Sequence, residues 1–141
     1  MFYRIKNKIQ DFFLAIKWFL QRGMRGYDDT ACWSIDYWFL EHIIKILKQF
    51  NRNKMGWQPW LGYKVVDGEF VAIDEEEEIT FEQSNEVYEL LLKNFEKLYD
   101  MLENDYEYYE KLGYEKFVKV RNELHEKTFK VFSDIFYTLW D

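Results

Sequence analysis

Apolar side chains recur at intervals of three or four residues through most of this chain, which is the period of an α-helix and not of a strand. The pattern predicts four long helices, at about residues 3–22, 29–50, 81–112 and 115–139, the third either continuous or broken near Asn104. One proline and six glycines argue against a many-stranded fold. We therefore expect a mainly α protein, an irregular bundle of about four long helices with one small β-hairpin.

The first predicted helix is amphipathic. Its apolar stripe consists of Phe2, Ile5, Ile9, Phe12, Phe13, Ile16, Phe19 and Leu20. The other face is basic, with Arg4, Lys6 and Lys17, as in helices that lie on membranes. Because the apolar stripe is so regular, we expect it to be packed in a core, and we predict no membrane partner. A turn at residues 23–26 should end the helix, since glycine supplies backbone freedom.

The second predicted helix begins after Asp28 or Asp29, either of which can cap the free amides of its first turn. Its apolar residues form two adjoining stripes, one of Trp33, Leu40, Ile43, Ile44 and Leu47, the other of Ile35, Phe39, Ile46 and Phe50. Such a wide apolar arc predicts a central helix that is packed on more than one side.

Local motifs predict the elements between the long helices. Asp67-Gly68 separates two β-prone runs within residues 63–73, a spacing typical of a hairpin, and so small a ribbon must pack on the helices. Thr80 and Gln83 match a capping box, and Gly113 marks a later turn. With no linker or repeat in view, residues 1–141 are predicted to form a single helical domain.

The amino-acid composition limits the classes of binding partner that this chain can have. The net charge of −7 disfavours binding to a nucleic-acid polymer, which requires neutralisation of phosphates. A lone cysteine, Cys32, excludes an internal disulfide and favours a cytosolic location. Aromatic residues make up 21% of the chain, which implies a core of large rings or an aromatic surface kept for a partner.

Residues 22–36 resemble a family of small proteins from tailed bacteriophages and prophages. The chain reads Arg22-Gly23-Met24-Arg25-Gly26-Tyr27-Asp28-Asp29 and then Trp33-Ser34-Ile35-Asp36, where that family shows Arg-Gly-aromatic-x-Asp and Trp-x-Leu-Asp. Its end, Leu139-Trp140-Asp141, is also common there, whereas Gly56-Trp57-Gln58-Pro59 is one residue longer than the family's Gly-aromatic-Pro loop. The resemblance implies a phage protein that acts in the cytoplasm of an infected bacterium.

Asp36 is the most informative polar position, because it shares a predicted helical stripe with Trp33 and Leu40. A carboxylate among apolar residues is costly unless it is paired or hydrogen-bonded. Arg22 and Arg25 are its candidate partners. In one interpretation they form an internal tether. In the other they form a ligand site, in which Asp36 binds a base or ribose and the arginines bind phosphate.

Trp33, Trp57, Trp60 and Tyr63 are candidates for an aromatic platform at this ligand site, because aromatic rings can stack on a base. The alternative is that these rings pack in the core. Trp57 and Trp60 are the more suggestive pair, since both lie in a polar loop.

The sequence contains little that indicates a metal or cofactor site. A di-iron bundle needs Glu-x-x-His on two helices, but Phe39 and Asn122 precede His42 and His125 by three residues. The Glu86-Val87-Tyr88-Glu89 segment fits the first half of the magnesium motif of all-helical nucleotide pyrophosphohydrolases, and Glu107-Tyr108-Tyr109-Glu110 fits the second half poorly. We predict no metal, no cofactor and no enzymatic activity.

The favoured prediction is a non-enzymatic phage accessory protein that binds a host component, such as a defence protein. One alternative is a small-molecule binder that sequesters a nucleotide signal through Arg22, Arg25, Trp33, Asp36, Trp57 and Trp60. A second alternative is the helical nucleotide pyrophosphohydrolase. The large apolar surface of four helices is also compatible with a homodimer.

Overall fold

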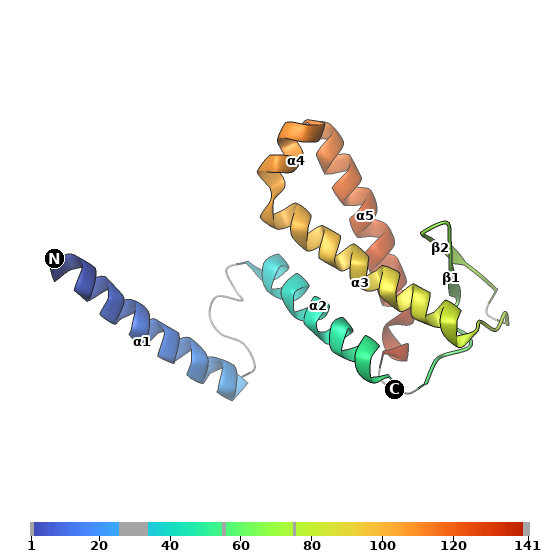
Figure 1. The fold of residues 1–141 in the computed structure, drawn as a ribbon, viewed down its shortest axis with the longest axis horizontal. Coiled ribbons are helices and arrows are strands. Elements are labelled where there is room, and N and C mark those ends of the chain that lie inside the picture. The colour runs from blue at the N-terminus through green and yellow to red at the C-terminus, as the bar shows by residue number, and fades with distance from the viewer. Residues whose placement is uncertain (1, 26–33, 55, 75, 140–141) are drawn as a thin grey trace. The chain divides into compact units, whose positions relative to one another are not determined.

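A computed structural model describes residues 2–25, 34–54, 56–74 and 76–139, with residues 2–9 and Arg25 described by their backbone alone. The elements are α1 (Phe2–Arg25), α2 (Ile35–Asn53), β1 (Tyr63–Val66), β2 (Glu69–Ala72), α3 (Phe81–Glu103), α4 (Asp105–Leu112), α5 (Tyr114–Ile135) and the 3-10 helix η2 (Phe136–Thr138) (Figure 1). The predicted fold class, mainly α with one small hairpin, is confirmed.

Two compact units make up the chain, Met1–Phe39 and Leu40–Asp141. The first unit contains α1 and the first residues of α2. The second contains the remainder of α2, the hairpin and α3 to η2. That residues 1–141 act as one domain stays a prediction.

Both predicted boundaries around residues 23–34 differ from the observed ones. α1 continues to Arg25, past Gly23, because one glycine costs a helix interior only about 1 kcal/mol. α2 begins at Ile35, several residues after the predicted start, and the Trp38 amide donates to the Ser34 carbonyl at 3.0 Å. Asp28 and Asp29, the predicted capping residues, lie outside the described residues.

The two apolar stripes on α2 differ in how far they are buried. Leu40, Ile43, Ile44 and Leu47 lie in the core. Ile35 and Ile46, from the second stripe, are 71% and 60% exposed. Phe39 and Phe50, from the same stripe, are half-buried, so the packing of α2 on more than one side stays a prediction.

The hairpin is confirmed, with Tyr63 opposite Ala72 and Val66 opposite Glu69. Asp67 and Gly68 both have positive φ, at 51° and 77°, which is the type I′ geometry that matches the twist of two short strands. The Ile73 amide donates to the Gly62 carbonyl at 3.0 Å and so extends the pairing beyond the strands.

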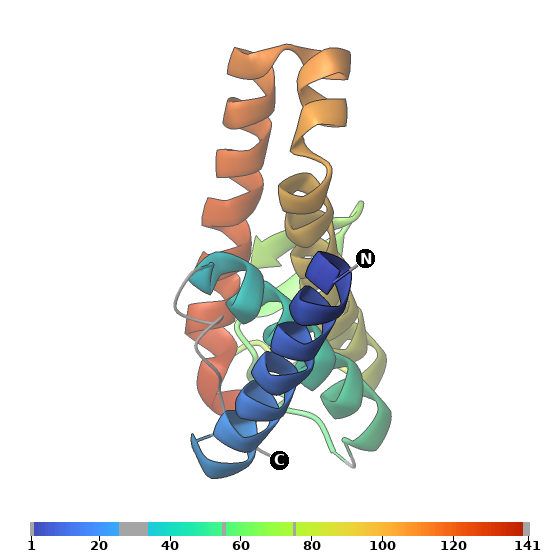
Figure 2. The same cartoon turned by 90° about the vertical axis from the view of Figure 1, so that its left-hand side faces the viewer.

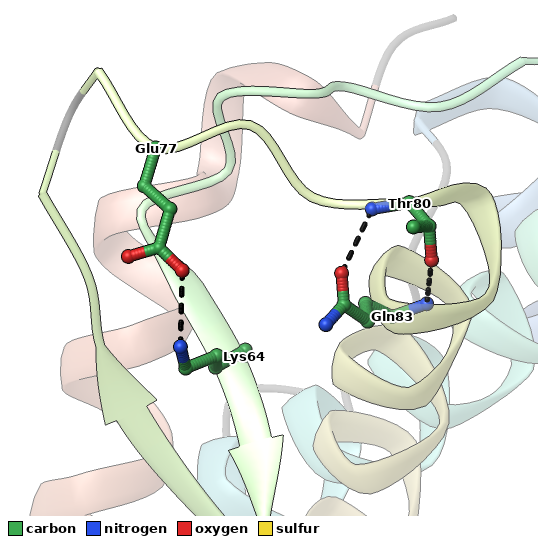
Figure 3. A network of polar contacts seen from close by, with 4 residues as sticks. All are labelled: Lys64, Glu77, Thr80 and Gln83. Atoms are coloured by element: carbon green, nitrogen blue, oxygen red, sulfur yellow. Dashed lines mark hydrogen bonds and ion pairs between the residues drawn. The ribbon is translucent and has the colours of Figure 1, made fainter.

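The capping box at the start of α3 is also confirmed. The Gln83 amide donates to Thr80 Oγ1 at 3.2 Å, and the Thr80 amide donates to Gln83 Oε1 at 2.9 Å (Figure 3). In the preceding acidic run, Glu77 forms an ion pair with Lys64 of β1 at 3.0 Å (Figure 3). These contacts fix the point at which the chain leaves the hairpin and enters α3.

α3 ends at Glu103, so the break predicted near Asn104 occurs and α4 is a separate short helix. The Asp100 carboxylate accepts hydrogen bonds from Asn104 Nδ2 at 2.7 Å and from the Tyr108 hydroxyl at 2.6 Å, across the break. Gly113, at φ 78°, then turns the chain into α5. α3 and α5 consequently lie side by side, with α4 at the connected end (Figures 1 and 2).

The core of the second unit lies mainly between α3 and α5. Fully buried side chains include Tyr88 and Phe95 of α3 and Phe117 of α5. The Phe95 ring meets those of Phe129 and Phe132 edge-on, each at a centroid distance of 5.4 Å. α5 ends at Ile135, before the predicted Leu139, and its last turn tightens into η2.

Candidate functional site

The six residues of the predicted ligand site fall into different parts of the structure. Arg22 and Asp36 belong to the first unit, while Trp57 and Trp60 belong to the second. Trp33 and the side chain of Arg25 lie outside the described residues. A joint ligand site of these six residues therefore stays a prediction.

Asp36 is exposed and does not occupy a buried stripe. Because α2 begins at Ile35, Asp36 lies in its first turn, where backbone amides are available and negative charge is favourable. Its Oδ1 accepts a hydrogen bond from the Tyr37 amide at 2.9 Å. The helix terminus thus favours a carboxylate at this position, and its pairing with Arg22 or Arg25 stays a prediction.

Trp57 and Trp60 have different surroundings. Trp57 Nε1 donates to the Ile79 carbonyl at 3.2 Å, and its ring meets Phe81 edge-on at 6.0 Å, so it holds the loop against the start of α3. Trp60 is 59% exposed and borders a hollow beside the hairpin. Of the two rings, Trp60 is the better placed for a ligand.

That hollow, which we call the hairpin hollow, has a volume of about 630 Å³. It is lined by Trp60, Leu61, Gly62, Tyr63, Ala72, Ile73 and Asp134. Its size lies within the range of small-molecule sites in proteins. The loop before β1, the end of β2 and the last turns of α5 meet there.

A polar network borders the hairpin hollow. The Tyr63 hydroxyl donates to Asp134 Oδ2, and Lys130 Nζ donates to the same oxygen at 3.0 Å. Burial, and then the bond to Asp134, raise the pKa of Tyr63, whereas the bonds from Tyr63 and Lys130 lower the pKa of Asp134. The bond to Asp134 likewise raises the pKa of Lys130. At neutral pH the network thus joins a neutral phenol, a carboxylate and an ammonium.

This network favours some ligands over others. The ionised Asp134 carboxylate lines the hollow and repels a phosphate group, and Lys130 already donates to that carboxylate. A neutral or cationic aromatic molecule that stacks on Trp60 is a better match. The sequence alone does not reveal this site, because Tyr63 and Asp134 are 71 residues apart.

The described residues contain no group of three or more His, Cys, Asp or Glu side chains placed to hold a metal ion. His125 stacks on Phe129 at a centroid distance of 4.3 Å, which is a packing contact. The pyrophosphohydrolase motif of Glu86 to Glu89 and Glu107 to Glu110 stays a prediction.

A second depression, which we call the α2–α5 groove, has a volume of about 180 Å³. Its lining is entirely apolar and consists of Ile43, Ile46, Leu47, Phe50, Phe132, Phe136 and Leu139. The Tyr88 hydroxyl bonds Thr138 Oγ1 at 3.0 Å and so fixes η2, which carries Phe136, against α3. Ile46 is 60% exposed and Phe136 is 39% exposed, so apolar side chains border an open groove.

Two residues that line the groove belong to the wide apolar arc predicted for α2. Ile46 and Phe50 come from the second stripe of α2, Phe132 comes from α5, and Phe136 comes from η2. The sequence feature that indicates this groove is therefore an apolar helix face that is wider than the part buried in the core.

The apolar face of α1 is not covered by the other described residues of its own unit. Its described large side chains, Phe12, Phe13, Ile16, Phe19, Leu20 and Met24, are between 41% and 88% exposed. These fractions describe the first unit by itself, and the burial of the stripe in a core stays a prediction. Among the described helices, none has a stretch long and apolar enough to cross a bilayer.

The fold is that of a mainly α protein, and its depressions include an apolar groove and a polar hollow. Comparisons with protein-family models, with curated proteins and with solved structures gave no match to this chain. The resemblance to phage proteins accordingly stays a prediction.

Proposed function

We propose that this chain is a non-enzymatic phage accessory protein that binds a host protein through the α2–α5 groove. The observation that supports the proposal most is the exposure of Ile46 and Phe136 at the border of an all-apolar groove. Leaving apolar side chains in water is unfavourable, and contiguous apolar patches commonly mark interaction sites. The proposed site of action is the cytoplasm of an infected bacterium.

The proposed partner segment is the apolar face of an amphipathic helix. The groove runs between two helical elements, and helices bind such grooves with apolar residues at i, i+3, i+4 and i+7. The rings of Phe132 and Phe136, with centroids 5.6 Å apart, form one wall. Phe50 of the opposite wall is held by an edge-on contact with Tyr88 at 5.1 Å. Walls fixed in this way reduce the entropic cost of binding.

Two exposed isoleucines on α2 allow a matched test. Ile46 borders the groove, whereas Ile35, 71% exposed, is not among its lining residues. Serine at either exposed position should change the free energy of unfolding by about 0.5 kcal/mol or less. The partner is first captured from host lysate and purified, and its Kd is then measured by titration calorimetry.

The proposal expects Ile46→Ser to raise the Kd by about tenfold, the effect of losing one apolar contact of about 1.4 kcal/mol, while Ile35→Ser leaves the Kd unchanged. Equal effects of the two variants would contradict the groove as the binding site. An unchanged Kd in both would contradict it as well.

A second candidate function is suggested by the hairpin hollow. Its volume and the exposed Trp60 ring suit a small aromatic ligand, such as the base of a nucleotide with little phosphate charge near Asp134. Native mass spectrometry of the purified protein tests this reading. A retained small molecule that is lost in Trp60→Ala but kept in Trp57→Ala would favour it over groove binding. A measured mass equal to that of the chain alone would contradict it.

A further inference from the structure

Strand β2 of the hairpin has a free edge. The Ile73 amide donates to the Gly62 carbonyl, so Ile73 occupies a hydrogen-bonded position of the antiparallel pair. Because bonded positions alternate along such a strand, the N–H and C=O groups of Phe70 and Ala72 face away from β1. Within the part of the chain that the structure describes, these groups have no hydrogen-bond partner. An edge of this kind is a template for one further strand.

The hairpin hollow lies at the end of this edge. Ala72 and Tyr63 are opposite each other in the hairpin, and both line the hollow. Residues that pair across neighbouring strands project their side chains to the same face. The residue of an added strand that pairs with Ala72 would therefore direct its side chain toward the hollow, whose volume of about 630 Å³ accommodates a long side chain.

The lining of the hollow matches a guanidinium group. Trp60 offers an exposed ring, and arginine stacks on aromatic faces and binds carboxylates. Asp134 Oδ2 accepts from Tyr63 and from Lys130, whereas Oδ1 accepts from no described residue. A carboxylate has about four acceptor positions, so Asp134 retains some for a ligand. Lys130, whose side chain is 71% exposed, is the cation with which an arginine would compete.

The surroundings of the hairpin are strongly acidic. Residues 63–78 contain seven Asp or Glu against one basic residue, Lys64, a formal charge of −6. Lys64 pairs with Glu77 (Figure 3), and Lys127 of α5 pairs with Glu69. Four carboxylates of this segment form no ion pair with a described residue: Asp67, Asp74, Glu76 and Glu78. This charge attracts a basic segment.

We propose that the hairpin binds an extended, arginine-containing segment of another protein, which adds a strand to β2 and places its arginine in the hairpin hollow. The site lies within the unit Leu40–Asp141 and is separate from the α2–α5 groove, so it does not rest on groove binding. A small ligand in the hollow and this arginine would exclude each other.

Two requirements select this occupant, an extended backbone and positive charge. A second copy of β2 has the extended backbone, but it would bring two segments of formal charge −6 together. Helix α1 is basic, but the N–H and C=O groups of a helix are bonded internally and do not pair with a strand edge. A basic extended peptide meets both requirements.

The test is fluorescence anisotropy of the full chain with labelled peptides of about eight residues, long enough to span β2. The first peptide alternates valine and threonine around one central arginine and has a lysine at each end. In the second, glutamate replaces the three basic residues. The proposal expects the basic peptide to bind at least tenfold more tightly, with affinity reduced by added salt. Equal binding of the two peptides would overturn it.

A matched pair of basic peptides tests strand addition itself. Each carries one N-methyl group, on the amide of the arginine or on the amide of the next residue. When arginine pairs with Ala72, only the arginine amide faces β2. The first N-methyl group should weaken binding at least tenfold, and the second should have little effect. Equal binding of these peptides would overturn the proposal, because charge attraction alone does not distinguish them.

Variants of the chain locate the site. Trp60→Ala should weaken binding of the basic peptide about tenfold, whereas Tyr106→Ala, at an exposed ring of α4, should not. Asp74→Lys should weaken binding more than Glu103→Lys, which replaces an exposed carboxylate at the end of α3 and changes the net charge equally. Ile46→Ser should leave this binding unchanged, which separates the hairpin site from the groove.

Two outcomes with these variants would overturn the proposal. One is an equal loss of peptide binding in Asp74→Lys and Glu103→Lys, which would indicate general charge attraction. The other is a dimer, measured by analytical ultracentrifugation, that Ala72→Pro dissociates while the wild-type protein binds no peptide. Proline removes the outward N–H of Ala72 and keeps the pairing with β1, so that result would assign the edge to a second copy.

Discussion

The Tyr63 hydroxyl donates a hydrogen bond to the Asp134 carboxylate and thereby joins β1 to the last turn of α5, across 71 residues of sequence. The Tyr63 ring is buried, and its edge-on contact with Phe70 lies at a centroid distance of 6.5 Å. Since a two-stranded ribbon is only marginally stable alone, contacts of this kind hold the hairpin on the helices. The same contact forms one border of the hairpin hollow.

Tyr63→Phe should lower the free energy of unfolding by about 1 kcal/mol. The ring and its packing are kept, and only the hydrogen bond to a carboxylate is lost, which we discount because Asp134 is partly exposed to solvent. Urea denaturation followed by circular dichroism measures the change. Tyr106→Phe, at an exposed tyrosine of α4, is the control and should have no effect. Equal stability of Tyr63→Phe and wild type would mean that the bond contributes nothing.

The pKa shifts in this network predict how stability depends on pH. The pKa of Tyr63 is raised above its ordinary value of 10.0, so its contribution is complete below pH 10 and is lost as pH rises through the folded-state pKa. The pKa of Asp134 is lowered from 3.8, so its contribution is present above that pH and is lost as pH falls through the folded-state pKa.

Tyr63→Phe should therefore reduce the loss of stability above pH 10, and Asp134→Asn should reduce the loss below pH 4. Part of the alkaline loss should remain in Tyr63→Phe, because the pKa values of Lys130 and Tyr108 are also raised. Denaturant titrations at several pH values measure both effects. Unaltered pH profiles in the two variants would contradict the assigned network.

Thr80→Ala should cost about 1 kcal/mol of stability, because it removes the acceptor for the Gln83 amide at the start of α3. Thr80→Ser keeps the hydroxyl and should cost much less. Since the two bonds of the capping box act together, the cost of Thr80→Ala with Gln83→Ala should be less than the sum of the single costs. Additive costs in urea denaturation would mean that the two bonds act independently.

Thr128→Val should stabilise the protein by about 1 kcal/mol. Thr128 is fully buried on α5, and its Oγ1 has no hydrogen-bond partner among the residues that the structure describes. Valine has nearly the same shape and removes the buried polar group, whose desolvation is costly. Thr128→Ser, which keeps the hydroxyl and deletes the methyl group, should instead be destabilising. Thermal unfolding of both variants decides the question, and destabilisation by valine would indicate a bound water on Oγ1.

Features that depend on a few neighbouring residues could be predicted from the sequence. The Asp67-Gly68 turn needs positive φ at two adjacent residues, and Asp and Gly tolerate it best. The Thr80–Gln83 box needs only two side chains at a fixed spacing. The start of α2 was predicted several residues too early, because several acidic and small polar residues between Asp28 and Asp36 suit a helix terminus.

Burial and the candidate sites could not be predicted in the same way. Periodicity shows which residues share a face of α1 or α2, but it does not show whether another element covers that face. Ile46 fits an apolar stripe as well as the buried Leu47 does, and yet it is 60% exposed. The hairpin hollow depends on residues far apart in sequence, which no local pattern connects.

Photo-crosslinking from position 46 tests the central claim, groove binding, most directly. A photoreactive phenylalanine replaces Ile46 in one protein and Glu123, an exposed residue of α5 outside the groove lining, in another. Both are expressed in the bacterial host and irradiated. The account predicts one discrete host-protein adduct from position 46, diminished by Phe136→Ser, and none from position 123. No adduct from position 46, or the same adducts from both positions, would contradict it.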